Sequence, residues 1–365
     1  MKFTCNKQEL TEAVSNVQRS VCSKSSLPAL EGILLKTSDS AISLCGYDLE
    51  MGITTVIPAS IGQQGEVVLN ARLFSEIVRR LPAETVTIEI DDKLIANIES
   101  GQSSFSIVGI DASEYPEMPS IQDDDCIEMT QAMLKSMIRQ TLFAVAESDN
   151  KPVHTGTLFE IEDGVIKLVS VDGYRLAMRT ERIQGNGSFH FVVPGKTLNE
   201  VLKLLGDEEN KLTLHVAKRH ILFEIDHYTV ISRLLEGEFL DYNSAIGGSN
   251  NAELLVDTRN FMNSVERVSL LITDRLKSPV RCIFSKEEIK LSCSTSIGKA
   301  SDSCPCQMQG EELEMGFNNR YLLDALRNAD GDQVKLQFNS PLSPMKVLPK
   351  EGDSFLFLVL PVRLK

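Results

Sequence analysis

Basic residues recur seven positions apart in three amphipathic segments of the chain. The three pairs are Arg72 with Arg79, Lys196 with Lys203, and Arg320 with Arg327. Seven residues are nearly two turns of an α-helix, so both cations of a pair would project from the same helix face. Such a face suits non-specific contact with the phosphates of a nucleic acid, because that contact needs no base-reading side chains.

A carboxylate follows four residues after the first cation of each pair, and it supports a second interpretation. The three carboxylates belong to Glu76, Glu200 and Asp324. Each could form an (i, i+4) ion pair with that cation, and for a single helix a solvated surface pair is the simpler explanation. Three repetitions of the same face favour a segregated positive surface instead, which would create a directed field.

These segments belong to a long internal repeat, because each begins 124 residues after the previous one. Other landmarks keep the same offset between the first two copies. The matched residues are Gly32 and Gly156, Ile42 and Ile166, Leu44 and Leu168, and Asp48 and Asp172. Several landmarks in one register predict that the chain is three copies of one domain.

Each copy combines short strands with two helices. Strand-like alternation recurs at 85–90, 211–216 and 333–338, and the basic segments predict one helix in each copy. Two helices packed on antiparallel sheets within about 120 residues indicate an α+β fold for each copy. Polar and acidic linkers place the predicted domains at 1–122, 123–248 and 249–365.

The net charge of the chain seems to oppose a nucleic-acid partner. The 365 residues include 37 Lys and Arg against 51 Asp and Glu, which gives a formal net charge of −14 at pH 7. Phosphate binding needs a basic surface. The conflict disappears if the helix cations are segregated from the acidic surplus. Apolar residues make up 42% of the chain, which is enough for a core in each copy.

The sequence contains no motif that indicates catalysis or metal binding. The five histidines show no His-x-x-x-His spacing, and Gly195-Lys196-Thr197 lacks the earlier glycine that a phosphate loop needs, because His190 stands in its place. Cys304-Pro305-Cys306 lacks the two-residue gap of zinc and redox motifs, and we interpret it as a turn. We therefore expect no enzyme activity, no cofactor and no metal site.

The chain shows no sign of a membrane or secreted location. No stretch approaches 18 apolar residues, and the start MKFTCNKQEL lacks the apolar core of a signal peptide. The eight cysteines are too sparse for a disulfide framework. We expect a cytoplasmic protein with reduced thiols and no membrane partner.

Four motifs carry a resemblance to a known family. They are VDGYRLA at 171–177, EGEFLDY at 236–242, MGFNNRYLLDAL at 315–326 and LPVRL at 360–364. With the three tandem copies and the total length, the whole chain resembles the bacterial sliding clamps, the β subunits of DNA polymerase III. The resemblance implies a head-to-tail homodimer whose six domains form a ring around duplex DNA. It also implies a non-catalytic processivity factor that binds peptides of the replicative polymerase, the clamp loader and repair proteins.

The residues expected to contact DNA combine the helix cations with two loop lysines, Lys24 and Lys151, that the resemblance adds. The full set is Lys24, Arg72, Arg79, Arg80, Lys135, Arg139, Lys151, Lys196, Lys203, Arg259, Arg320 and Arg327. The resemblance also implies ring-closing contacts of Phe105 and Ile107 in one chain with Leu271 and Ile272 in the other. Because Phe105 and Ile107 alternate along a strand, they could equally belong to the core of their own domain.

The resemblance further implies a peptide-binding pocket near the end of the chain. Its expected wall is Val171, Gly173, Tyr174, Arg175, Leu176, Leu240, Met345, Leu358, Leu360, Pro361, Val362, Arg363 and Leu364. Leu176, Leu360 and Val362 would form an apolar slot, while Arg175 and Arg363 could hold carbonyl or carboxylate groups. Leu240 stands where proline is common in the family, and Val171 stands where threonine is common.

Two functions of different classes fit the repeated charge pattern. One is a sliding clamp that encircles DNA, with the helix cations facing the phosphates. The other is a triplicated protein-interaction scaffold that does not encircle DNA and whose helix cations are merely solvated. Retention on circular DNA would distinguish the two.

Overall fold

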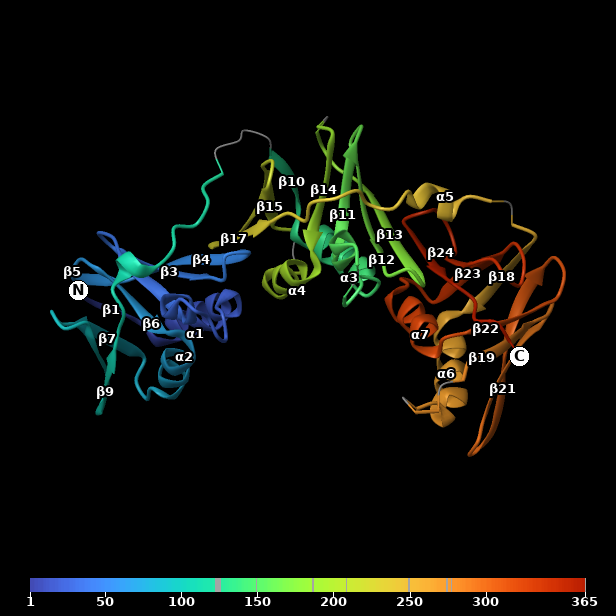
Figure 1. Ribbon diagram of the computed structural model, residues 1–365, viewed down its shortest axis with the longest axis horizontal. Helices are drawn as coiled ribbons and strands as arrows, with labels where there is room; N and C mark the ends of the chain where they lie inside the picture. Colours follow the sequence, from blue (N-terminus) through green and yellow to red (C-terminus); the bar gives the residue numbers. More distant parts are fainter. Residues whose placement is uncertain are drawn as a thin grey trace. The chain divides into compact units, whose positions relative to one another are not determined.

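The structure is a computed structural model that describes residues 1–365 except 122–125, 149, 186, 208, 249, 274, 277 and 365. The predicted domain limits at 122, 123, 249 and 365 lie outside the described residues. The described chain forms two compact units, residues 1–132 with 199–234, and residues 133–198 with 235–365 (Figure 1). The division between the units runs through the second copy of the repeat. No described helix has both the length and the apolar composition to cross a membrane.

The order of elements repeats three times along the chain, and each time a strand leads directly into a helix. The first copy contains β1 (Lys2–Asn6), α1 (Lys7–Val17), β2 (Gly32–Thr37), β3 (Ala41–Tyr47), β4 (Met51–Pro58), β5 (Ser60–Gln63), β6 (Glu66–Asn70), α2 (Ala71–Arg80), β7 (Thr85–Ile90), β8 (Ile95–Ser100) and β9 (Ser103–Val108). The second contains β10 (Cys126–Thr130), α3 (Gln131–Leu142), β11 (Gly156–Glu162), β12 (Val165–Val171), β13 (Arg175–Arg182), β14 (Phe189–Pro194), α4 (Gly195–Leu204), β15 (Lys211–Val216), β16 (His220–Ile225) and β17 (Tyr228–Arg233).

The connecting helix α5 (Tyr242–Ile246) precedes the third copy. That copy contains β18 (Ala252–Asp257), α6 (Thr258–Val268), β19 (Val280–Phe284), β20 (Glu288–Thr295), β21 (Gly298–Gln309), β22 (Leu313–Phe317), α7 (Asn319–Asn328), β23 (Gln333–Phe338), β24 (Met345–Pro349) and β25 (Phe355–Val359). The predicted strands at 85–90, 211–216 and 333–338 are confirmed as β7, β15 and β23. The three basic helices are confirmed as α2, α4 and α7.

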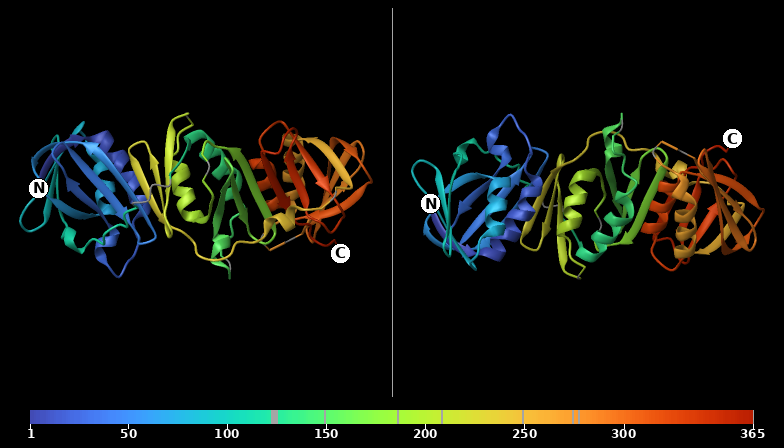
Figure 2. Two further views of the ribbon diagram at one scale, coloured as in Figure 1. Left: turned by 90° about the horizontal axis from the view of Figure 1, so that it is seen from above. Right: turned by 90° about the horizontal axis from the view of Figure 1, so that it is seen from below.

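The first unit holds two antiparallel sheets. A five-stranded sheet has the order β5-β1-β7-β8-β9, and an eight-stranded sheet has the order β10-β15-β16-β17-β4-β3-β2-β6. The second sheet joins two copies, because β17 pairs with β4 and places Ser232 opposite Met51. Helices α1 and α2 pack side by side in this unit (Figures 1 and 2).

The second unit is built on one sheet of twelve strands, in the order β14-β11-β12-β13-β25-β24-β23-β18-β21-β20-β19-β22. Here β25 pairs with β13 and places Val359 opposite Arg175, so the third copy continues the sheet of the second. Helices α6 and α7 pack side by side (Figures 1 and 2).

Three isolated antiparallel bridges confirm the register of the repeat. They join Val68 to Ile110, Val192 to Leu235, and Gly316 to Val362. Val68, Val192 and Gly316 are spaced by the same 124 residues that relate the basic helices. In each copy, the segment after the last strand is therefore hydrogen-bonded to the same position of the strand that precedes the second helix.

Helix α2 shows why these segments fold as amphipathic helices. The Asn70 side chain caps the helix by accepting a hydrogen bond of 3.0 Å from the Leu73 N–H. Phe74, Ile77 and Val78 are buried on one face, while the cations remain on the other. Asn318 caps α7 in the same way, with 2.9 Å from the Arg320 N–H to its side-chain oxygen.

The repeated glycine marks a close approach of neighbouring strands. A Cβ placed on Gly32 would lie 2.3 Å from Cγ1 of Val68, and one placed on Gly156 would lie 2.5 Å from the carbonyl oxygen of Val193.

Gly32→Ala should therefore lower the free energy of unfolding by about 2 kcal/mol through overpacking. Urea unfolding measures the change. Gly62→Ala is the control, since its Cβ would meet nothing closer than 3.6 Å; an equal loss in both variants would contradict this explanation.

The prediction of a turn at Cys304-Pro305-Cys306 is wrong. These residues lie inside β21, where Pro305 stands opposite Glu288 of β20. From Cys306 onward the strand also pairs with β18. Pro305, which has no N–H to donate, thus lies at the end of the stretch that pairs on one side only.

Candidate functional site

The cations predicted on the second helix of each copy are exposed. They are Arg72, Arg79 and Arg80 on α2, Lys196 and Lys203 on α4, and Arg320 and Arg327 on α7. Within the described part of the chain, no ion pair involves Arg72 or Arg79. These two guanidinium groups are therefore accessible to an external anion such as a phosphate.

The carboxylates that follow the first cation of each helix have other partners. Glu76 pairs with Arg80, Asp324 pairs with Arg175, and the Glu200 carboxylate lies 2.7 Å from Nζ of Lys203. The hydrogen bond and the charge of Arg80 lower the pKa of Glu76. Each of these three ion pairs uses a cation other than Arg72, Lys196 or Arg320, unlike the (i, i+4) pairs of the second interpretation.

The remaining predicted cations lie on first helices and in loops. Arg139 of α3 pairs with Asp330 at 3.3 Å, and Arg327 pairs with Glu266 at 2.7 Å. Both pairs are exposed, so they contribute little to stability and could exchange for phosphates. The others are Lys24 and Lys151, exposed in loops, Arg259, exposed at the start of α6, and Lys135, half-buried on α3.

A cleft of about 960 Å³ lies in the second unit. Among the predicted pocket residues, it is lined by Tyr174, Arg175 and Val362. The rest of its described lining is Val145, Ala146, Glu147, Ser148, Asp172, Ile272, Thr273, Ser278, Pro279, Asn318, Asn319, Arg320, Tyr321 and Asp324. The cleft therefore combines residues of the second copy, of α7 and of the segment after β25.

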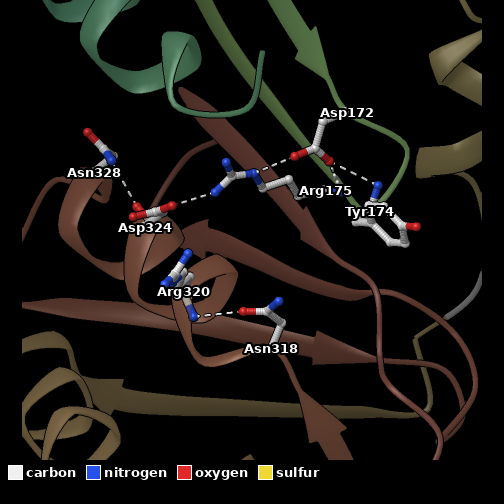
Figure 3. Close-up of polar contacts among 7 residues, drawn as sticks. All are labelled: Asp172, Tyr174, Arg175, Asn318, Arg320, Asp324 and Asn328. Atoms are coloured by element: carbon white, nitrogen blue, oxygen red, sulfur yellow. Dashed lines mark hydrogen bonds and ion pairs between the residues drawn. The ribbon is translucent and has the colours of Figure 1, made fainter. Parts of the chain in front are cut away.

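A tight turn at one edge of the cleft positions Tyr174 and Arg175. The Oδ1 atom of Asp172 accepts hydrogen bonds of 3.0 Å from the N–H groups of both residues (Figure 3). Gly173 between them has a φ of +84°, in the left-handed region that glycine adopts without strain. The first copy has the same turn at Asp48, where Leu49 takes a φ of +75°.

Arg175 is held by two carboxylates inside this cleft. Its Nε donates to Oδ2 of Asp172 at 2.9 Å, and its Nη1 donates to Asp324 of α7 (Figure 3). The guanidinium also lies over the rings of Tyr321 and Phe143, 4.6 and 5.6 Å from their centroids. Only 13% of the Arg175 side chain is exposed. Its charge is therefore already balanced within the protein.

The segment after β25 forms another side of the cleft. The Leu360 N–H donates to the carbonyl oxygen of Tyr174 at 3.0 Å, and the Val362 N–H donates to that of Gly316 at 2.8 Å. Leu360 and Val362 are 37% and 41% exposed. Two apolar side chains are thus presented at the surface by a backbone that is fixed on both sides.

The other predicted pocket residues fall into separate places. Val171, Leu176 and Leu358 share one buried cluster, whereas Met345 is fully buried in the core of the third copy. Leu240 is 42% exposed. The rest are Gly173 and Arg363, which are exposed, and Pro361 and Leu364, which are half-buried.

Asp172, Tyr321 and Asp324 line the cleft but were missed among the predicted site residues. The sequence could have indicated Asp172, because this residue matches Asp48 in the repeat. Tyr321 and Asp324 lie within the motif at 315–326, where the helix pattern suggested only an (i, i+4) partner of Arg320 for Asp324 and no role for Tyr321. Their role depends on a partner 149 residues away in the chain, as for Asp324 and Arg175.

The residues predicted to close a ring lie at or near exposed strand edges. β9 is an edge strand of the five-stranded sheet. Phe105 on it is 39% exposed and Val108 is 76% exposed, so this strand is not an ordinary core strand. Leu271 and Ile272 are half-buried, and Ile272 also lines the cleft. Among the described residues, 298–305 of β21 pair on one side only, with β20.

The thiols of Cys304 and Cys306 are held in their protonated form. Burial raises the pKa of Cys304 to about 12 and that of Cys306 to about 11, so both thiols are protonated at neutral pH. No group of three or more His, Cys, Asp or Glu side chains among the described residues could hold a metal ion.

Three family models match the chain in succession. They describe the N-terminal, central and C-terminal domains of the DNA polymerase III β subunit, and they match residues 1–119, 128–241 and 244–363. Together they span nearly the whole chain in the order expected for three tandem domains.

Curated relatives and solved structures agree along the full length. The β sliding clamp of Bacillus subtilis is 34% identical over 376 residues, covering 100% of both chains, and its crystal structure gives a TM-score of 0.97. The β sliding clamp of Halalkalibacterium halodurans is 32% identical over 378 residues, again with 100% of both chains covered. A sliding clamp of Pseudomonas aeruginosa solved bound to griselimycin is 25% identical, with a TM-score of 0.95 and 100% of both chains covered.

Proposed function

Because the chain belongs to the bacterial β sliding clamp family, the β subunits of DNA polymerase III, we propose that two copies close head to tail into a ring around duplex DNA. The protein is a DNA sliding clamp, a processivity factor without catalytic activity of its own. One observation supports the ring above all: exposed cations recur at the same place on the second helix of each copy, in a chain of net charge −14.

Sliding requires phosphate contacts that exchange easily. Arg72 and Arg79 are exposed, and the predicted contacts Arg139 and Arg327 are held only by exposed ion pairs. Each cation that neutralises a phosphate releases counterions, so the attraction is independent of base sequence and weakens with salt. The twelve cations predicted above would form this inner surface, including Lys24 and Lys151 from loops.

Ring closure would join the exposed edge of β9 to that of β21 in a second copy. Phe105 and Ile107 would meet Leu271 and Ile272 of that copy, and the backbones would pair as neighbouring strands. Covering these apolar side chains removes them from water, which stabilises the dimer.

The cleft in the second unit would bind short peptides of the replicative polymerase, the clamp loader and repair proteins. Tyr174 and Val362 in its lining, with Leu360 beside Tyr174, supply exposed apolar surface. The fixed backbone around them keeps that surface in place. A largely preformed cleft with a few polar groups is typical of a peptide-binding site. We also retain the domain limits 1–122, 123–248 and 249–365, and a cytoplasmic location, as parts of this proposal.

Retention on DNA circles tests the ring. After loading by a clamp loader onto nicked circular DNA, the protein should stay bound, and it should be lost once the circle is linearised. Phe105→Asp should abolish retention, because a charge at the β9 edge prevents closure. Val56→Asp is the matched control, since Val56 is 51% exposed on the inner strand β4. Equal loss of the native protein from circles and linear DNA would reject the ring and favour the interaction scaffold.

A further inference from the structure

A row of stacked side chains runs from the core of the second unit to the cleft. It consists of Phe357, Phe143, Arg175, Tyr321 and Tyr174, and we call it the aromatic row. Phe357 and Phe143 meet edge to face with centroids 5.3 Å apart. The guanidinium of Arg175 lies between Phe143 and Tyr321, and the rings of Tyr321 and Tyr174 stack at 5.9 Å with an interplanar angle of 21°.

The two ends of this row differ in exposure. Phe357 is fully buried at one end, whereas Tyr174 is 61% exposed at the other and lines the cleft. Tyr321 comes from α7, while Arg175 and Tyr174 come from the second copy. The exposed ring of Tyr174 is therefore connected to the buried core through a continuous series of side-chain contacts.

Arg175 is the only charged member, and its orientation decides whether the row is continuous. A guanidinium stacks on a ring only when its plane is fixed. Here Asp172 binds Nε and Asp324 binds Nη1, from opposite copies of the repeat (Figure 3). The side chains of Asp172 and Asp324 are 13% and 34% exposed, so the contact with Asp172 is largely buried and that with Asp324 is half-buried.

We propose that Asp324 is a positioning residue of the cleft, which acts through Arg175 to fix Tyr321 and Tyr174 as one wall before any ligand enters. This proposal rests on the proposed function only in taking the cleft as the peptide-binding site. It also changes the expected role of Arg175. With two carboxylates already bound, Arg175 supports the aromatic wall and is not the receptor for a peptide carboxylate.

The absence of tryptophan from the chain permits a direct measurement. Tyr174→Trp introduces a single tryptophan at the exposed end of the aromatic row, and its quenching by acrylamide reports how well that ring is held. Asp324→Asn in this background should raise the quenching constant about twofold, because the neutral amide no longer holds the guanidinium. Asp324→Glu should restore most of the protection.

Asp330→Asn is the matched control. Asp330 follows α7 and pairs with Arg139 and Gln140 of α3, but it does not contact the aromatic row. It should leave the quenching constant unchanged. If Asp324→Asn also left quenching unchanged while lowering the melting temperature, Asp324 would only hold the two copies together and the proposal would be wrong.

Ligand affinity gives the second readout, with griselimycin as the probe. In the chain with native Tyr174, Asp324→Asn should weaken its binding about tenfold, and Asp330→Asn should not. Increased quenching with unchanged griselimycin affinity would show that the ordered wall does not serve the cleft, which overturns the proposal. If the native chain binds no griselimycin but stays on DNA circles, the assignment of the cleft fails while the ring stands, and the proposal fails with the cleft.

Discussion

Reversing the charge of Arg72, Lys196 and Arg320 together should lower loading onto nicked circular DNA at least about tenfold, because three contacts with phosphates are lost. Each lost contact should also reduce the salt dependence of DNA binding by about one unit. All three residues are exposed at equivalent places on their helices. Each change to glutamate replaces an attraction to phosphate by a repulsion, in a chain whose net charge is already −14. The fraction of protein that a clamp loader places on the circle, followed by gel filtration at several salt concentrations, measures the effect.

The control carries the same change of charge on strands. Lys36, Lys211 and Lys290 are exposed on β2, β15 and β20, where each pairs with a glutamate. Reversing these three should leave loading close to that of the native protein. Native mass should report a dimer for both triple variants. Equal loading of the two would show that α2, α4 and α7 do not face the DNA.

Deleting residues 360–365 should remove most stimulation of the replicative polymerase while the dimer remains intact. The deletion takes away Val362, which lines the cleft, and the hydrogen bonds that tie Leu360 to Tyr174 and Val362 to Gly316. The predicted ring-closing edges are β9 and β21, which the deletion leaves in place. Product length in primer extension should fall at least tenfold, and native mass reports the dimer.

A point variant separates the cleft from the backbone around it. Val362→Asp keeps both hydrogen bonds but places a charge in the cleft, so it should cause a similar loss of stimulation. Leu342→Ser is the control, because Leu342 is 73% exposed on a loop and does not line the cleft. Unchanged product length in Val362→Asp would reject the assignment of the cleft.

Periodicity was sufficient to predict most of the fold. The strands β7, β15 and β23 have the predicted bounds, since two-residue alternation between a buried and an exposed face is written directly in the sequence. The helix faces of α2, α4 and α7 follow from the spacing of their apolar residues in the same way. The offset of 124 residues then recurs in the three isolated bridges.

The partners of individual side chains could not be predicted in this way. Asp324 binds Arg175 of another copy, and Glu76 binds Arg80 within its own helix, although both occupy the same position of the repeat. The prediction of a turn at Cys304 was wrong because a proline is tolerated in a strand where one edge of that strand is unpaired. Such choices depend on which strands and helices become neighbours in space.

The sheet residues on which the connecting segments pack differ between the copies. In the first copy, Cys45 and Tyr47 share a buried cluster with Tyr115 of the connector that follows. Val169 and Val171 hold the same places in the second copy, beneath Phe239 and Tyr242. Strand β20 of the third copy matches β12 at an offset of 123 residues, and it has Ser292 and Ser294 at these places. The copies are therefore not interchangeable. If the third copy were moved ahead of another copy, the aromatic residues of a connecting segment would pack against serines and not against apolar side chains.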